Sequence, residues 1–193
     1  VEAVRVDVLV TEDAKPVRGL ALGDFEVLDN GVRQQIDLVS FEQIPLNVVL
    51  ALDASDSVVG ERLESLRSAA GALMDGLTSD DQAGLVTFSH VVGLGSGLTG
   101  QLADVRAALK RPLAPGTTAL VDGSFAGMML GEADVGRALL IVFSDGLDTA
   151  SWLSPDLVLD TAKRSDVVVY AVVLGTSQKP PFLRDLISTT GGR

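Results

Sequence analysis

Three short polar segments of this chain are rich in oxygen-bearing side chains and lie beside strongly apolar stretches. DASDS at 53–57 follows the apolar run 47–52, SDGLD at 144–148 follows the run 138–143, and GTT at 116–118 precedes a third apolar stretch. These segments offer carboxylate and hydroxyl oxygens, with no nitrogen or sulfur donor among their side chains. Hard oxygen donors suit Mg²⁺, Mn²⁺ or Ca²⁺ better than zinc or copper, so the segments predict a site for a hard divalent cation.

The spacing within DASDS supports a cation site. Asp53, Ser55 and Ser57 stand at positions i, i+2 and i+4, so a tight loop can turn all three side chains toward one point. Hydroxyls are neutral ligands and would leave the cation able to accept an outside anion, such as an Asp or Glu of a partner protein. The alternative is that the two serines cap a following helix while Asp53 accepts hydrogen bonds from loop amides. The presence of three such segments favours the cation site.

The elements that must position these segments follow from the hydrophobic pattern. Four nearly continuous apolar runs, at 47–52, 84–89, 138–143 and 166–174, are typical of strands buried on both faces. Amphipathic helical stretches separate them, so the pattern predicts an α/β fold. We expect a doubly wound, mostly parallel, Rossmann-like sheet with helices on both faces. Sites in such sheets form at the carboxyl ends of the strands, where the strand order reverses.

Helix signals lie between and after these strands. Apolar residues recur at helical spacing over 59–77 and 102–109, and a further helix is expected to begin near Ala119. Ser154-Pro155-Asp156 combines an N-cap, a proline at the first helical position and an early acid. A last helix is expected to end at Gly191, a typical C-cap residue.

The amino-terminal stretch has a different hydrophobic pattern. Valines alternate with other residues over 4–10, which is typical of a strand with one buried face. The stretches 25–28 and 32–41 flank an Asn-Gly pair and predict a β-hairpin. We therefore expect a small β-rich extension over residues 1–45 and a main domain over residues 46–193.

Composition narrows the function classes. The formal net charge of −11 repels phosphates, so we expect no nucleic acid partner and no anionic membrane surface. It favours cations or basic partners, although it also serves solubility. The chain has no cysteine, which excludes disulfides and zinc–thiolate sites. No apolar run is long enough for direct membrane insertion.

With these polar segments and strands, the chain resembles the von Willebrand factor type A domain, also called the integrin I-like domain. That family carries a metal-ion-dependent adhesion site, made of Asp-x-Ser-x-Ser after the first strand, a Thr in a later loop and an Asp-Gly after the fourth strand. The matching residues are Asp53, Ser55 and Ser57, Thr118 in GTTAL, and Asp145 in FSDG. The segments DDQAGLVTFS and VVVYAVVLG are also similar to the family's second and fifth strands.

The resemblance implies roles for these residues. Ser55, Ser57 and Thr118 would reach the cation directly, while Asp53 and Asp145 would act partly through water and hold the hydroxyls in place. Mg²⁺ is the expected cation, with Mn²⁺ and Ca²⁺ as alternatives.

This sequence departs from the family's pattern at several points. Asp56 stands where the family usually has Gly, and Thr117 is an alternative to Thr118. Asp56, Thr117 and Asp148 are expected at the rim of the site. Trp152, in a polar loop, is expected to pack on the rim or, alternatively, to contact a partner. The family's sixth strand would follow Gly192, so the domain is expected to be truncated before its last strand.

The hypothesis that the protein is an enzyme has less support in the sequence. GSGLTG at 95–100 fits G-x-G-x-x-G, but the stretch that follows lacks the strand and acid of a dinucleotide site, and an antiparallel hairpin explains the glycines better. His90 is the only histidine, and no G-x-S-x-G segment is present. We therefore expect no enzyme.

The expected function is divalent-cation-dependent protein binding, as in cell adhesion. A scaffold or assembly domain with a vestigial or structural metal site is the alternative, and a nucleotide-dependent enzyme is a remote one. The first 36 residues resemble the leader of bacterial VWFA-related proteins, which tend to be exported. Periplasmic, cell-surface or secreted localisation is therefore expected.

Overall fold

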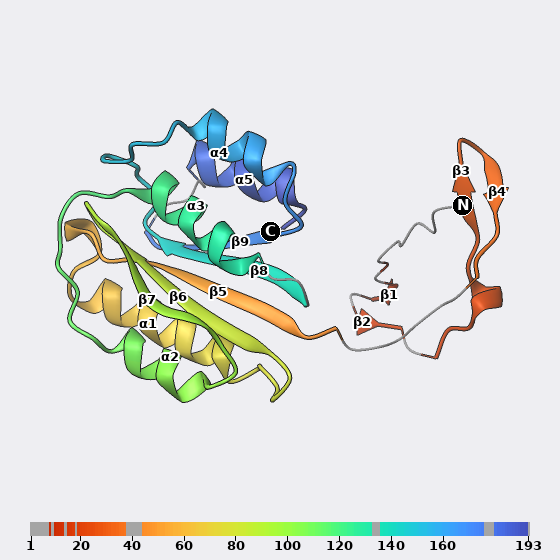
Figure 1. The fold of residues 1–193 in the computed structure, drawn as a ribbon, viewed down its shortest axis with the longest axis horizontal. Coiled ribbons are helices and arrows are strands. Elements are labelled where there is room, and N and C mark those ends of the chain that lie inside the picture. Colours follow the sequence, from red (N-terminus) through yellow and green to blue (C-terminus); the bar gives the residue numbers. More distant parts are fainter. Residues whose placement is uncertain are drawn as a thin grey trace. The chain divides into compact units, whose positions relative to one another are not determined.

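The computed structural model divides the chain into two compact units, Val1–Gln43 and Ile44–Arg193. The residues that the structure describes are 8, 10–13, 15–17, 19–37, 44–132, 136–175 and 180–192. Each unit is described by itself, and Figure 1 gives the element labels.

The smaller unit consists of short antiparallel strand pairs. β1 (Thr11–Glu12) pairs with β2 (Lys15–Pro16), and η1 (Leu22–Asp24) is a turn of 3₁₀ helix. β3 (Val27–Asp29) pairs with β4 (Val32–Gln34) through the predicted Asn-Gly turn, whose two residues have φ of 48° and 81°. The hairpin is confirmed, but its second strand ends at Gln34 rather than at residue 41. Most of the strand predicted over 4–10 lies outside the described residues.

The larger unit is built on one five-stranded sheet with the order β7-β6-β5-β8-β9. β5, β6, β8 and β9 are parallel, and β7 runs antiparallel to β6 at one edge. The strands are β5 (Leu46–Asp53), β6 (Gln82–Phe88), β7 (Val92–Thr99), β8 (Arg137–Ser144) and β9 (Val168–Val173). The four predicted strands are confirmed to within about two residues at each end. The prediction that all four are buried on both faces is wrong for β9, an edge strand on which Tyr170 and Val172 are exposed.

Helices cover both faces of this sheet, as predicted (Figure 1). α1 (Glu61–Met74) and α2 (Leu102–Leu109) lie on one face. α3 (Leu120–Gly131), α4 (Pro155–Ala162) and α5 (Pro181–Thr190) lie on the other. Alternate residues of β5 enter two separate apolar cores, since Leu50 and Leu52 pack with α1 and α2 whereas Val49 and Ala51 pack with α3 and α5.

Glycines let α3 approach the sheet closely. A Cβ at Gly123 would lie 2.6 Å from the ring of Phe88, and one at Gly127 would lie 2.5 Å from Leu140 Cδ1. A side chain at Gly123 would collide with the ring and Cβ of Phe88 and push the helix away from the sheet, whereas at Gly127 the end of the Leu140 side chain would have to move. The close contact therefore fixes where the start of α3, and the loop that precedes it, can lie.

The predicted helix ends are largely confirmed. Ser154 Oγ accepts a hydrogen bond from Leu157 N at 3.3 Å, and Gly191 has the left-handed φ of 76° expected at a C-cap. A 3₁₀ turn, η2 (Asp56–Val58), precedes the predicted helical stretch. α1 begins two residues later than the first residue of that stretch, because Gly60 has φ of 82°.

The glycines of 95–100 lie in edge strand β7 and at its end rather than in a turn from strand to helix, which does not suit a dinucleotide loop. Within the described part of the chain, no helix has the length and apolar character needed to cross a membrane.

Candidate metal centre

The candidate centre lies at the carboxyl ends of β5 and β8. From β5 the chain passes to β6 and β7 on one side and later to β8 and β9 on the other, so the strand order reverses between β5 and β8. Asp53 is the last residue of β5, and Asp145 directly follows β8. The parallel register brings these two carboxylates to the same edge of the sheet.

Asp53 organises the loop that follows β5. Its side chain is fully buried, and its Oδ1 accepts a hydrogen bond from Ser55 N at 2.8 Å. Its Oδ2 accepts a hydrogen bond from Ser144 Oγ at 2.5 Å. Ser55 Oγ and Ser57 Oγ lie 2.9 Å apart and share a hydrogen bond. The structure thus brings Asp53 and both serines together at one point.

The two carboxylates have an unfavourable electrostatic environment. Burial raises the pKa of Asp53, the nearby Asp145 raises it further, and the hydrogen bonds from Ser144 and Ser55 only partly oppose this. Asp145 Oδ1 is buried and has no hydrogen-bond partner in the described structure. Either a proton or a cation would relieve this arrangement, because both reduce the negative charge that the two groups share.

The loop before α3 contributes a buried threonine. Thr118 is 5% exposed, whereas its neighbour Thr117 is exposed. Thr118 N donates to Thr149 Oγ1 at 2.9 Å, and Thr118 O accepts from Thr149 N at 2.8 Å and from Ala150 N at 3.0 Å. Asp56 N donates to Gly116 O at 2.8 Å. Backbone hydrogen bonds therefore tie the three polar loops to one another.

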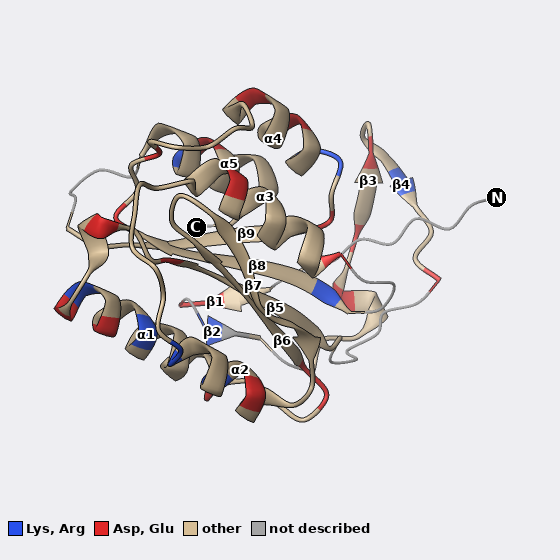
Figure 2. Ribbon diagram, turned by 60° about the vertical axis from the view of Figure 1, so that its left-hand side comes forward, with Lys and Arg blue, Asp and Glu red and all other residues tan. Residues whose placement is uncertain are grey.

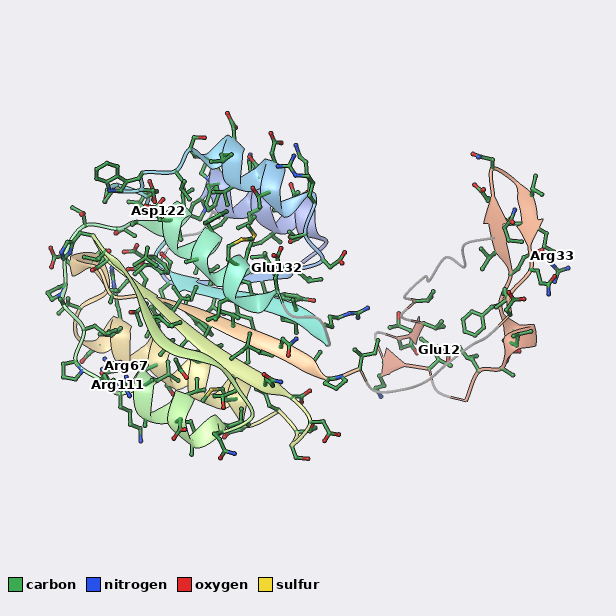
Figure 3. All side chains as sticks on the ribbon, in the orientation of Figure 1. Glu12, Arg33, Arg67, Arg111, Asp122 and Glu132 are labelled. Carbon is green, nitrogen blue, oxygen red and sulfur yellow. The ribbon has the colours of Figure 1, made fainter. Side chains whose placement is uncertain are left out.

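Asp122 and Asp148 hold the loop between β8 and α4 against the start of α3. Asp148 Oδ1 accepts from Ser151 Oγ at 2.5 Å and from Val121 N at 3.2 Å. Asp122, marked in Figure 3, accepts from Trp152 N and Leu153 N, each at 2.9 Å. Both carboxylates thus serve as acceptors for loop and helix amides.

Trp152 does not pack on the rim, because the residue is 94% exposed; the alternative that it contacts a partner stays a prediction. The hydrogen bonds of Trp152 N and Leu153 N to Asp122 hold this part of the loop. They leave the indole in solvent.

The capping alternative for the two serines is wrong. Ser55 precedes the η2 turn without a side-chain cap hydrogen bond, and α1 begins only after Gly60. The expected amide bond to Asp53 is present, from Ser55 N. Asp56 is exposed, and its backbone N donates to Gly116 O. Its side chain has no assigned role among the described residues.

Sequence reasoning overlooked Ser144 and Thr149, the hydrogen-bond partners of Asp53 and Thr118. The available signal for Ser144 was its place at the end of β8, because the register pairs Phe143 with Leu52 and so brings Ser144 level with Asp53. No group of three or more His, Cys, Asp or Glu residues suited to a metal occurs among the residues that the structure describes. A centre here would therefore depend on hydroxyls as well as two carboxylates.

Comparison with known proteins identifies a family that has this fold. The model of the von Willebrand factor type A domain family matches residues 47–193. An uncharacterised protein, sll0103, of the cyanobacterium Synechocystis is 34% identical over 97 residues, which cover 49% of this chain and 23% of that protein. Inter-alpha-trypsin inhibitor heavy chain H2 of Mus musculus is 24% identical over 186 residues, which cover 88% of this chain and 20% of that protein. The chain thus spans less than a quarter of the length of either relative.

A solved structure has the same fold. Proximal thread matrix protein 1 from the mussel byssus, with a zinc-occupied metal-ion-dependent adhesion site, superposes with a TM-score of 0.65 at 21% identity. The superposition covers 76% of this chain and 40% of that protein. At this identity the likeness shows the shared fold, and the zinc belongs to the mussel protein.

Proposed function

The chain belongs to the von Willebrand factor type A domain family, and we propose that it binds a protein partner through a divalent cation. Domains of this family commonly act as protein-interaction modules and are generally not enzymes. The proposed ligand set is Asp53, Ser55, Ser57, Thr118 and Asp145. A bound cation would supply a coordination position that an Asp or Glu of the partner fills.

The observation that carries this proposal is the buried, unpartnered Oδ1 of Asp145 beside the buried Asp53. A buried carboxylate oxygen without a donor is costly unless something positive binds it. The shared Ser55–Ser57 hydrogen bond adds two hydroxyl oxygens at the same place. Oxygen donors of this kind fit a hard cation, with Mg²⁺ proposed and Mn²⁺ or Ca²⁺ as alternatives.

The protein's own residues have distinct tasks in this proposal. Asp53 orients the loop by accepting from Ser55 N, and Ser144 holds Asp53 in turn. Thr149 holds the backbone of Thr118. The ligand loops are thus fixed by hydrogen bonds of the protein itself, which supports a site that is ready to bind. The exposed Asp56, Thr117 and Asp148 would line the rim that meets the partner.

Thermal melting in EDTA and after addition of Mg²⁺, Mn²⁺, Ca²⁺ or Zn²⁺ tests the cation site. A cation that binds the folded state raises its melting temperature, and at about 100 times its Kd it adds about 2.7 kcal/mol to the free energy of unfolding. Asp53→Ala should abolish this rise. Asp104→Ala, which removes an exposed acid in the first turn of α2, is the matched control and should keep it. If no cation raises the melting temperature of the wild type, the domain is better described as a scaffold with a vestigial site.

Partner capture tests the second half of the proposal. The domain is immobilised and incubated with a bacterial cell-envelope extract in Mg²⁺ or in EDTA, because we propose an exported protein. A partner retained in Mg²⁺, released by EDTA and not retained by Asp53→Ala supports cation-dependent binding. A partner retained equally in all three cases would mean that the cation does not mediate the contact. A melting shift on addition of NAD or ATP would instead favour the remote enzyme alternative.

A further inference from the structure

A groove of about 570 Å³ adjoins the candidate metal centre. It lies between the loop that follows β8 and the first turns of α4 and α5, and Asp145 belongs to both the groove and the centre. Its walls are mainly apolar, with Leu159 and Phe182 half-buried and Leu147 69% exposed at the opening. Its size is in the range of ligand pockets, which are mostly apolar with a few polar groups that fix orientation.

The groove is also acidic. Asp145, Asp148, Asp156 and Asp185 line it, and none of the described lining residues is basic. Figure 2 shows acidic residues on both α4 and α5. The first turn of α4 offers a helix dipole that stabilises Asp156, but Asp185 lies further along α5 and pairs only with the exposed Arg184. An exposed ion pair of this kind is weak, so the carboxylate can exchange it for another cation.

An occupant must therefore combine apolar surface with positive charge. A lysine or arginine side chain does this, because its aliphatic stem packs on apolar walls while its charged end reaches the carboxylates. The shared Asp145 makes the groove continuous with the position where the partner's acid would bind the cation. One partner segment can therefore reach both places.

We infer that the groove beside Asp145 binds a basic residue with an apolar neighbour, located a few residues from the partner's metal-binding acid. This inference rests on the proposed cation site and adds the chemistry of the segment that the domain selects. The bound segment is thus mixed in charge: an acid for the cation, and a Lys or Arg next to a Leu, Ile or Val for the groove.

Labelled synthetic peptides test the inference by fluorescence anisotropy in Mg²⁺ and in EDTA. Each peptide carries one glutamate and a lysine–leucine pair, separated by one to four glycines. Matched peptides replace the lysine by glutamine, or the glutamate by glutamine. For the best spacing, the wild type should bind the lysine peptide about five-fold more tightly than its glutamine counterpart, as expected for two exposed charge contacts. The preference should shrink as salt is raised.

A double variant locates the preference on the protein. Asp156→Asn with Asp185→Asn should reduce the preference for lysine to less than about two-fold. The matched control, Asp104→Asn with Asp80→Asn, removes two exposed acids elsewhere on the unit and should keep the preference. Thermal melting of both double variants checks that they fold.

The outcomes separate the two proposals. If the wild type does not distinguish lysine from glutamine, or if the control loses the preference as well, the groove inference is wrong while cation-dependent binding of the glutamate can still stand. If neither EDTA nor replacement of the glutamate changes peptide affinity, the cation proposal fails. The preference for lysine over glutamine, measured in EDTA, then tests the groove inference alone. Sedimentation of the protein alone completes the test, since a dimer that the Asp156/Asp185 variant dissociates would mean that a second copy occupies the groove.

Discussion

A buried aspartate lies near each end of β5, and the two carboxylates have opposite surroundings: Asp81, which directly precedes β6, lies near the first residue of β5, and Asp53 is its last residue. Near its first residue, Asp81 Oδ1 accepts from Leu46 N at 2.8 Å, and Asp81 Oδ2 accepts from Thr78 N at 2.7 Å and from Thr78 Oγ1 at 2.9 Å. At its last residue, Asp53 accepts from one amide and one hydroxyl and lies near a second carboxylate, Asp145. An aspartate side chain thus has three hydrogen-bond donors at one end of the strand, whereas the aspartate at the other end has two and lies near a second carboxylate.

The pKa shifts follow this difference. Burial favours protonation of Asp81, but the hydrogen bonds from Thr78 and Leu46 outweigh it and lower the pKa. Burial dominates at Asp53 and raises the pKa. A carboxylate with enough hydrogen-bond donors stabilises the fold. The carboxylates of Asp53 and Asp145 have fewer donors and repel each other, so a bound positive charge would stabilise them. The carboxyl end of β5, where Asp145 Oδ1 has no hydrogen-bond partner in the described structure, is the end that supports the proposed cation site.

The largest expected effect is the loss of the satisfied carboxylate. Asp81→Ala leaves three donors without an acceptor, so we expect the free energy of unfolding to fall by about 3 kcal/mol. Its response to Mg²⁺ should be unchanged, because the residue is at the opposite end of the strand. Urea unfolding in EDTA and in Mg²⁺ measures both. The exposed neighbour provides the control, since Asp80→Ala should change stability by less than about 0.5 kcal/mol.

Asp145→Asn should have the reverse effect. In EDTA the variant should be at least as stable as the wild type, because one of two mutually repelling carboxylates is gone. In Mg²⁺ it should lose the cation's contribution, about 2.7 kcal/mol at 100 times the wild-type Kd. The same urea experiments measure this. A variant destabilised in EDTA as strongly as Asp81→Ala would show that the two ends of β5 do not differ as we describe.

Acid should reduce the contribution of Asp81 to the free energy of unfolding. This effect should be smaller than those of the two substitutions above. Its folded pKa lies below the unfolded value near 3.8, so its stabilisation is present above pH 3.8 and is lost as the pH falls through the folded pKa. The stability difference between the wild type and Asp81→Asn, about 2 kcal/mol at pH 7, should therefore narrow in acid. Unfolding curves between pH 7 and pH 2 measure it. A difference that widens in acid would contradict the lowered pKa.

The sequence predicted the centre of the sheet well because β5, β6 and β8 are buried on both faces. β5 and β8 are continuous apolar runs, and that pattern has few other solutions. The helix α1 begins at Glu61, two residues after the first residue of the predicted apolar spacing, because Val59 and Gly60 are not helical. The hydrophobic pattern does not report such a backbone change at a helix start.

The site was only partly accessible to sequence reasoning. The spacing of Asp53, Ser55 and Ser57 suggested a common point, and the structure brings them together. Their assignment as metal ligands stays a prediction. The bonds of Thr149 to Thr118 and of Asp122 to Trp152 join loops about 30 residues apart in the chain. No local pattern encodes such long-range pairs, which arise only once β8 and α3 are packed.

The ties between the polar loops have a kinetic consequence. The loops bearing Asp56, Gly116, Thr118 and Thr149 are already held by their own backbone hydrogen bonds. A cation that binds at the proposed centre would not need to order a flexible segment, so the loss of its own hydration water would limit its association. The rate of exchange at the proposed site would then be a property of the ion, and slow dehydration would distinguish Mg²⁺ from Ca²⁺.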